Sequence, residues 1–203
     1  MNINKIKNLI EKSKRPVVLA GSGVSISNTR KDLLKFIKKN SIPLVTAWSH
    51  DIYPNHDKFY FGRQGSIGNR VGNFIVQYSD LLIILGSRLS IRQTSYNWKS
   101  FAKKAKIISV DIDKYELNKN LVKIDYKIKM DLKVFFKKIN RINLNNKNTN
   151  NQLKWNSWVK WCNFVKDLLS PKINDYKTYQ SKINIYHFII ELFNLVKKNS
   201  IIV

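Results

Sequence analysis

A glycine and two arginines follow the most apolar run of the sequence. Leu81–Leu85 passes directly into Gly86, Arg88 and Arg92. A run that is apolar on both faces is typical of a strand buried inside a parallel sheet, and ligands of open α/β sheets lie beyond the carboxyl ends of such strands. An arginine at that position requires either an anionic ligand or a carboxylate partner, and the sequence leaves both alternatives open.

Two glycine-rich turns are further candidates for ligand contact. Gly21 and Gly23 follow an apolar segment, and their backbone amides can face a phosphate. A full dinucleotide fingerprint has a third glycine where this chain has Ile26, so a plain tight turn explains the pattern equally well. The second turn contains Gly62 and Gly65.

Acidic residues end a later apolar segment. Asp111 closes the segment 106–111, and an acid at the tip of a strand is where nucleotide folds often hold ribose hydroxyls. Asp113 follows it, and an N-cap for a helix over 115–118 accounts for that residue equally well.

These residues require a framework of alternating strands and helices. The pattern predicts a doubly wound, mainly parallel α/β sheet of about six strands, Rossmann-like, with flanking helices. The segments read as strands are 17–20, 43–47, 81–85, 106–111 and a short edge strand at 123–128. The segments read as helices are 4–13, 28–39, 70–78 with Val71, Phe74 and Ile75 facing inward, and 131–139.

The composition changes after residue 140. Residues 143–152 are mostly Asn and Lys and predict a linker, which leads into a helix over 153–169. Its Trp155, Trp158 and Trp161 share one side, and packing is the favoured explanation. A further helix is predicted over 183–198. The expected organisation is a domain over 1–140, a linker with the tryptophan-rich helix over 141–182, and the truncated start of another domain over 183–203. The apolar end, Ile201–Val203, is interpreted as a strand cut short, so the chain is expected to be a fragment.

The formal charge of +24 first suggests a nucleic-acid partner. The lysines are instead spread through every segment, and a chain rich in Lys, Asn and Ile is typical of A/T-rich coding sequence. We therefore expect no nucleic-acid partner, and no membrane span or signal peptide, which predicts a cytoplasmic protein. Cys162 is expected to be a buried apolar residue, and His50 and His56 to be surface or structural residues without a metal.

Five blocks of sequence, in register, carry a family resemblance. They are 15–24 (RPVVLAGSGV), 42–46 (IPLVT), 62–69 (GRQGSIGN), 82–88 (LIILGSR) and 110–113 (VDID). Over about residues 4–139 the chain resembles the middle domain of thiamine-diphosphate-dependent enzymes of the acetolactate-synthase type. Residues 183–203 look like the opening of that family's C-terminal domain.

The resemblance implies an enzyme that decarboxylates a 2-oxo acid and ligates the product, acts as a dimer or tetramer, and uses thiamine diphosphate with Mg²⁺. Both cofactors would be held outside this chain, because the family's Gly-Asp-Gly motif does not occur here, so the fragment alone is expected to be inactive. The middle domain in relatives holds FAD in a non-redox role, ADP or nothing. The residues of this chain that fall at the corresponding contacts are Thr46, Ala47, Gly62, Gly65, Gly86, Arg88, Arg92, Asp111 and Ile112, with Gly21 and Gly23 in the first turn.

Two departures from the family pattern count against FAD. Ser90 and Ile91 stand where the synthases commonly carry two aspartates, and Gln64 replaces a frequent histidine. Two other classes of protein remain as alternatives. One is an NAD-dependent enzyme of sirtuin or deoxyhypusine-synthase type, which would need a catalytic His or Lys in the cleft, and the other is a basic nucleic-acid-binding protein.

Overall fold

The computed structural model describes residues 3–48, 52–144, 154–172, 182–197 and 199–202. Its centre is a six-stranded sheet in which every neighbouring pair is parallel. The order across the sheet is β3-β2-β1-β4-β5-β6. The strands are β1 (Pro16–Ala20), β2 (Leu44–Thr46), β3 (Tyr60–Arg63), β4 (Leu81–Leu85), β5 (Lys106–Asp111) and β6 (Tyr126–Lys129). The predicted α/β fold class is confirmed.

The two central strands are buried along their whole length. Every residue of β1 and β4 is buried, and the two strands pair from Pro16–Leu81 to Ala20–Leu85. The chain order runs outward from β1 to β3 on one side, and from β4 to β6 on the other. The direction of winding therefore reverses between β1 and β4, which is where doubly wound sheets open a crevice for ligands.

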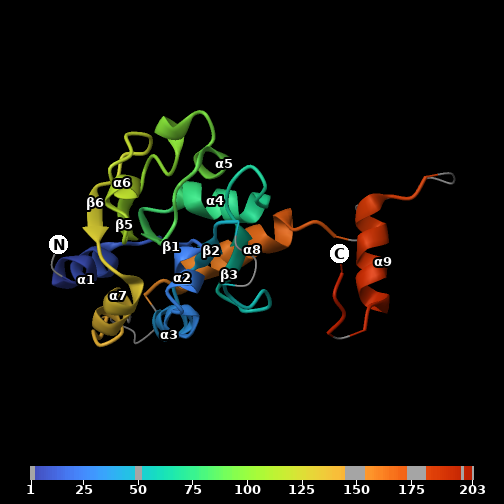
Figure 1. Ribbon diagram of the computed structural model, residues 1–203, viewed down its shortest axis with the longest axis horizontal. Helices are drawn as coiled ribbons and strands as arrows, with labels where there is room; N and C mark the ends of the chain where they lie inside the picture. Colours follow the sequence, from blue (N-terminus) through green and yellow to red (C-terminus); the bar gives the residue numbers. More distant parts are fainter. Residues whose placement is uncertain (1–2, 49–51, 145–153, 173–181, 198, 203) are drawn as a thin grey trace. The chain divides into compact units, whose positions relative to one another are not determined.

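Helices cover both faces of the sheet (Figure 1). On one face α7 packs against α1 and α3, and on the other α4 packs against α8. The helices are α1 (Ile3–Lys12), α2 (Gly23–Ile26), α3 (Arg30–Asn40), α4 (Arg70–Tyr78), α5 (Ile91–Thr94), α6 (Lys114–Leu117), α7 (Leu132–Ile139), α8 (Asn156–Leu169) and α9 (Ile185–Leu195), with a 3-10 turn η1 (Trp98–Ser100).

Two local expectations differ from the structure. The strand β3 lies where the sequence suggested only a connection and a turn, because its four residues are half polar and carry no apolar run. Phe74 was expected to face inward, yet its side chain is 45% exposed. It stacks on Tyr78 one turn later, with ring centroids 6.1 Å apart, so the outer face of α4 is aromatic as well.

The tryptophan-rich helix packs on the sheet domain. Trp155 and Trp158 are 1% and 5% exposed, and their indole nitrogens donate to the carbonyl oxygens of Ser13 and Pro16 at 3.1 Å each. Trp161 is partly buried and stacks on Trp158 at 4.9 Å between centroids. The predicted packing role is confirmed, and the first compact unit of the chain accordingly extends to Leu169.

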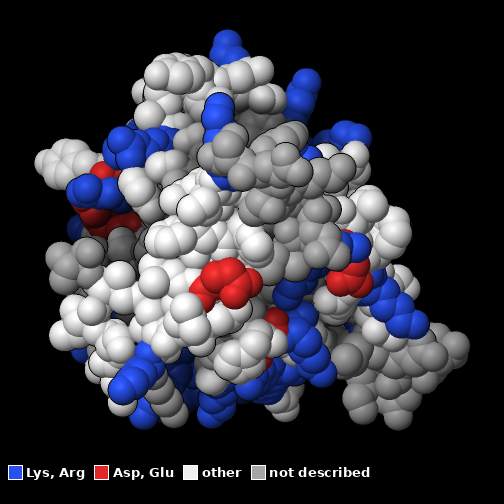
Figure 2. Space-filling view, turned by 90° about the vertical axis from the view of Figure 1, so that its right-hand side faces the viewer, with Lys and Arg blue, Asp and Glu red and all other residues white. Residues whose placement is uncertain are grey.

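Residues 170–203 form a second compact unit. Its helix α9 has no buried residue, and apolar side chains such as Ile185, Phe193 and Leu195 are 60% exposed or more. Among the described residues, no helix is both long enough and apolar enough to cross a membrane. Figure 2 shows basic side chains at many separate places of the face it draws, with few acidic ones between them.

Candidate functional site

The turns that follow β1 and β4 interlock at the switch point of the sheet. The amide of Gly21 donates to the carbonyl of Leu85 at 2.9 Å, and the amide of Gly23 donates to that of Gly86 at 3.0 Å. A Cβ on Gly21 would lie 2.6 Å from the Cα of Ser87, so only glycine permits this approach. The backbone amides of Gly21 and Gly23 therefore already donate hydrogen bonds within the fold and are not available to a phosphate.

Arg88 emerges from this junction into solvent. Its side chain is 77% exposed, and its Nε lies 3.4 Å from Oε1 of Glu116. The carboxylate partner that the sequence left open for Arg88 is therefore present as Glu116, although Arg88 itself is exposed, because Leu89 adopts a positive φ of 48° and is itself buried. The arginine is thus free to move between Glu116 and an anion at little cost.

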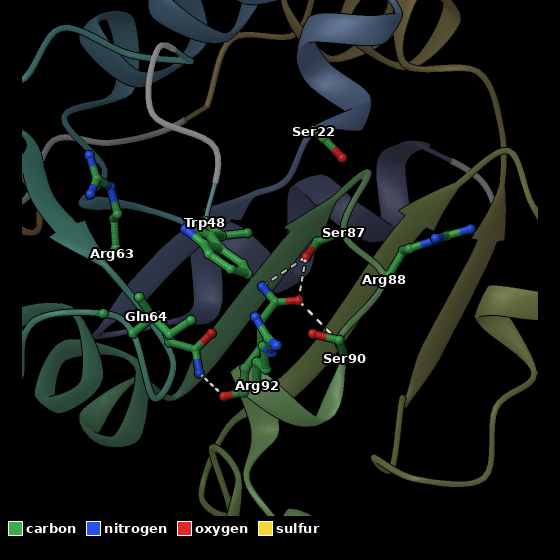
Figure 3. A pocket seen from close by; sticks show the side chains of 12 residues that line it. Ser22, Trp48, Arg63, Gln64, Ser87, Arg88, Ser90 and Arg92 are labelled. Atoms are coloured by element: carbon green, nitrogen blue, oxygen red, sulfur yellow. Dashed lines mark hydrogen bonds between the residues drawn. The ribbon is translucent and has the colours of Figure 1, made fainter. Parts of the chain in front are cut away.

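A small cavity of about 170 Å³ lies on one side of Arg88. Figure 3 shows Arg92 beside Trp48 in this cavity, with Arg88 pointing away from them. The guanidinium carbon of Arg92 is 5.0 Å from the centre of the Trp48 ring, which is a cation–π arrangement. The wall therefore combines a flat aromatic surface with a positive charge.

Two buried polar atoms of the small cavity have no hydrogen-bond partner among the described residues. They are Oε1 of Gln64 and Nε of Arg63, and Gln64 is only 6% exposed. The Nε2 of Gln64 donates to the carbonyl of Gln93, so the amide oxygen has to point the other way. An unpaired buried acceptor and donor are costly to the folded state.

The loop that carries Arg92 is fixed to the second glycine-rich turn. The carbonyl of Arg92 accepts the amide of Ser66 at 2.7 Å, and a Cβ on Gly65 would lie 2.6 Å from that same oxygen. The side chain of Gln93 bonds to Ser87 and, as the N3 member of a capping box, to the backbone of Ser90. Arg92 is therefore presented by a rigid backbone.

A larger cavity of about 540 Å³ lies on the other side of Arg88. Its lining contains the apolar side chains of Met130 and Leu132 and four acids, Asp111, Asp113, Glu116 and Asp131. Asp113 and Asp131 are N-caps of α6 and α7, which confirms the capping alternative for Asp113. One oxygen of Asp111 accepts the amide of Asp113 at 2.9 Å.

The structure brings seven of the eleven predicted site residues to these two cavities. Ala47 and Arg92 line the small cavity, and Arg88 lines both. The residues lining the large cavity are Gly23, Gly86, Asp111 and Ile112. The other four, Gly21, Thr46, Gly62 and Gly65, are not among the lining residues. Thr46 is 2% exposed and its hydroxyl pairs with that of Tyr60 at 3.0 Å.

Sequence reasoning did not single out several lining residues. Ser22 borders both cavities, Trp48 supplies the aromatic wall, and Glu116 pairs with Arg88. Ser22 lies between the two glycines of the first turn, which was a usable signal. Trp48 and Glu116 lie in segments without a periodic pattern, and no motif marks them.

Other reactive side chains lie outside the cavities. Burial raises the pKa of the Cys162 thiol, which matches the expected buried, inert role. Burial and the nearby Asp57 carboxylate raise the pKa of Tyr53. The Cys162 thiol and the Tyr53 hydroxyl are therefore both neutral near pH 7. His50 lies outside the described residues. Within the described ranges, no group of three His, Cys, Asp or Glu side chains is arranged to hold a metal ion.

Comparison with known proteins agrees with the fold and the blocks of sequence. Residues 3–139 match the thiamine pyrophosphate enzyme central domain. A probable acetolactate synthase large subunit of Methanococcus aeolicus is 36% identical over 181 residues, which cover 86% of this chain and 30% of the relative. Acetolactate synthase 1, chloroplastic, of Nicotiana tabacum is 31% identical over 206 residues, covering 100% of this chain and 29% of the relative.

The chain spans about 30% of the length of these two curated relatives. The match gives no support to the NAD-dependent or nucleic-acid-binding alternatives. Because residues 3–139 match the thiamine pyrophosphate enzyme central domain, the chain belongs to the thiamine-pyrophosphate-dependent enzymes of acetolactate-synthase type. Those residues correspond to the central domain of the family.

Proposed function

We propose that the complete protein is a thiamine-diphosphate-dependent enzyme that decarboxylates a 2-oxo acid such as pyruvate and joins the remaining acyl group to a carbonyl acceptor. The central-domain match over residues 3–139 carries this proposal, together with relatives that are acetolactate synthases. Thiamine diphosphate and Mg²⁺ would be held by residues beyond this chain. The organisation into a central domain over 1–140, a connection over 141–182 and the start of another domain over 183–203 belongs to the same proposal, as do a cytoplasmic location and a homodimeric or tetrameric state.

The part of this function that the chain itself supplies is the binding of an ADP-containing cofactor, FAD or ADP, at the carboxyl edge of the sheet. The larger cavity, at about 540 Å³, lies within the roughly 300–1,000 Å³ range of small-molecule sites. Its apolar side chains suit an adenine ring, and the strand-end carboxylate of Asp111 suits ribose hydroxyls. Such a cofactor would stabilise the domain and would take no part in the reaction.

Charge decides where the diphosphate would lie. The large cavity is lined by four acids against the two cations Arg88 and Lys133, so its net charge repels phosphate. Arg88 borders both cavities and is exposed enough to swing from Glu116 onto an anion. The diphosphate is therefore placed at the boundary between the cavities, beside Ser22 and Arg88. The second half of a longer cofactor would enter the small cavity, where Trp48 offers a flat aromatic surface and Arg92 a positive charge.

Thermal unfolding of the 203-residue chain with ADP, FAD or adenosine tests this site. We expect ADP to raise the melting temperature more than adenosine does, because only ADP engages Arg88. Arg88→Ala should weaken ADP binding by about 1.5–3 kcal/mol, the value of a charge-assisted hydrogen bond. Arg141→Ala removes an exposed arginine that lines neither cavity and serves as the control. Equal losses in both variants, or no stabilisation by either nucleotide, would contradict the proposal.

The enzymatic proposal is tested on the complete protein. The product of the full coding sequence, purified and supplied with thiamine diphosphate and Mg²⁺, is expected to release CO₂ from pyruvate. The 203-residue chain under the same conditions is expected to release none. A complete coding sequence that contains no Gly-Asp-Gly motif and no catalytic glutamate domain would remove the basis of the enzymatic proposal while leaving the nucleotide site open to its own test.

A further inference from the structure

A third cavity lies at the opposite end of the sheet from the proposed nucleotide site. It has a volume of about 610 Å³ and is enclosed by the η1 segment that precedes β5 and by the connection from α6 to β6. It contains five lysines, two from the η1 segment and three from the α6–β6 side: Lys99, Lys103, Lys119, Lys123 and Lys127. We call it the lysine hollow.

Ion pairs neutralise only part of the positive charge of the hollow. Asp125 is its one acidic lining residue, and Oδ2 of Asp125 already accepts the amide of Ile107 at 2.8 Å. The other oxygen lies 3.9 Å from Nζ of Lys123, at the outer limit of an ion pair. Lys119 pairs with Glu116, whereas Lys99 and Lys103 have no ion-pair partner among the described residues. A concave surface with one sign of charge raises the local concentration of counter-ions.

Apolar residues also border the lysine hollow. Phe101, Ile107 and Val122 are at most 7% exposed and border it, and the partly buried Trp98 adds an aromatic wall. The η1 segment is anchored from beneath, because the side chain of Gln77 accepts the amide of Ala102 at 3.1 Å. A hollow lined by both lysines and apolar side chains fits an anion that also has an apolar body, and lysine binds phosphate as a compact point charge.

We infer that the lysine hollow is a binding site for a small organic phosphate with an aromatic or similarly apolar group. Its volume of about 610 Å³ lies within the roughly 300–1,000 Å³ range of small-molecule sites. The phosphate would sit between Lys99 and Lys103 on one side and Lys123 on the other. A ligand held there ties the η1 segment to the α6–β6 connection and stabilises the folded chain by mass action.

The test uses 1-naphthyl phosphate as the probe and calorimetry on the 203-residue chain. Replacing Lys99 and Lys103 together by Ala should weaken its binding by about tenfold or more, because two charge-assisted contacts are lost. The matched control replaces Lys137 and Lys138 by Ala, two exposed lysines at the end of α7 that do not line the hollow. It removes the same net charge, and we expect its effect to stay below about twofold, as for screened distant charges.

Further measurements distinguish binding of the probe in the lysine hollow from nonspecific electrostatic attraction of an anion to a basic chain. Inorganic phosphate should bind more weakly than 1-naphthyl phosphate, and Trp98→Ala should reduce that difference. ADP stabilisation should survive the Lys99 and Lys103 replacements, and 1-naphthyl phosphate binding should survive Arg88→Ala. Equal weakening by both lysine pairs would show an effect of net charge and overturn the inference. Loss of probe binding in Arg88→Ala would place the probe at the carboxyl edge and overturn it as well.

Discussion

The two ends of strand β1 are built in opposite ways. Its amino end is sealed by Trp155, just before α8, and Trp158, within α8, whose buried indoles donate to the carbonyls of Ser13 and Pro16. At its carboxyl end the amides of Gly21 and Gly23 donate hydrogen bonds to the carbonyls of Leu85 and Gly86, and the surrounding surface opens into two cavities. Stability is therefore concentrated at the sealed end, and capacity for binding at the open end.

The reason for the difference is the size of the side chains at each end. Tryptophan buries a large apolar area and satisfies its one donor on a strand-end carbonyl, so it closes the sheet without leaving polar groups unpaired. Glycines at the other end bring two backbones together and leave no side chain to fill the space beyond. A ligand can enter only where that space is left.

Removal of a sealing tryptophan should have the largest effect on stability. Trp155→Ala is expected to lower the free energy of unfolding by about 3–5 kcal/mol, the usual cost of truncating a buried aromatic residue. Phe164→Ala in α8, the helix that follows Trp155, is the control, since Phe164 is 60% exposed, and should change it by less than about 0.5 kcal/mol. Urea unfolding monitored by circular dichroism measures both. Similar losses in the two variants would mean that α8 does not seal the sheet in the way described.

At the open end, Gly21 is the most sensitive position for stability. Gly21→Ala should cost about 1–3 kcal/mol, because the added Cβ meets the backbone of Gly86 and Ser87 and neither can move without shifting β4. Ser22→Ala, one residue further, is the control and should be near neutral. The same denaturation experiment applies, and a Gly21→Ala chain as stable as the parent would show that the two turns are not in close contact.

The central strands of the sheet could be predicted from the sequence, whereas one edge strand could not. The buried strands at 81–85 and 106–111 were predictable because apolar residues fill both of their faces. Strand β3 was not, because an edge strand of four residues, two of them only partly buried, leaves no periodic pattern. Asp111 was placed correctly at a strand end for the same reason that β5 was recognised.

The parts of the site that sequence reasoning missed depend on contacts between distant segments. Gln64 meets Gln93 across 29 positions, and Trp48 meets Arg92 across 44 (92 minus 48), and neither pairing has a local signature. The exposure of Arg88 depends on the positive φ of Leu89, a conformation rare for leucine that propensity does not predict. Strand positions follow from composition, whereas side-chain direction in the loops follows from tertiary contacts.

The smallest effect on stability is expected at Arg88, the residue with the largest proposed role in binding. Arg88→Ala should change the free energy of unfolding by less than about 1 kcal/mol, because an ion pair with a mostly exposed arginine is weak. A double-mutant cycle with Glu116→Gln isolates the pair, and we expect a coupling of about 0.2–1 kcal/mol that declines with added salt. Glu116 also pairs with Lys119, so the cycle is best repeated in a Lys119→Ala background. A coupling well above this range would mean that Arg88 is committed to Glu116 and unavailable to a diphosphate, and the open end of the sheet would then resemble the sealed one.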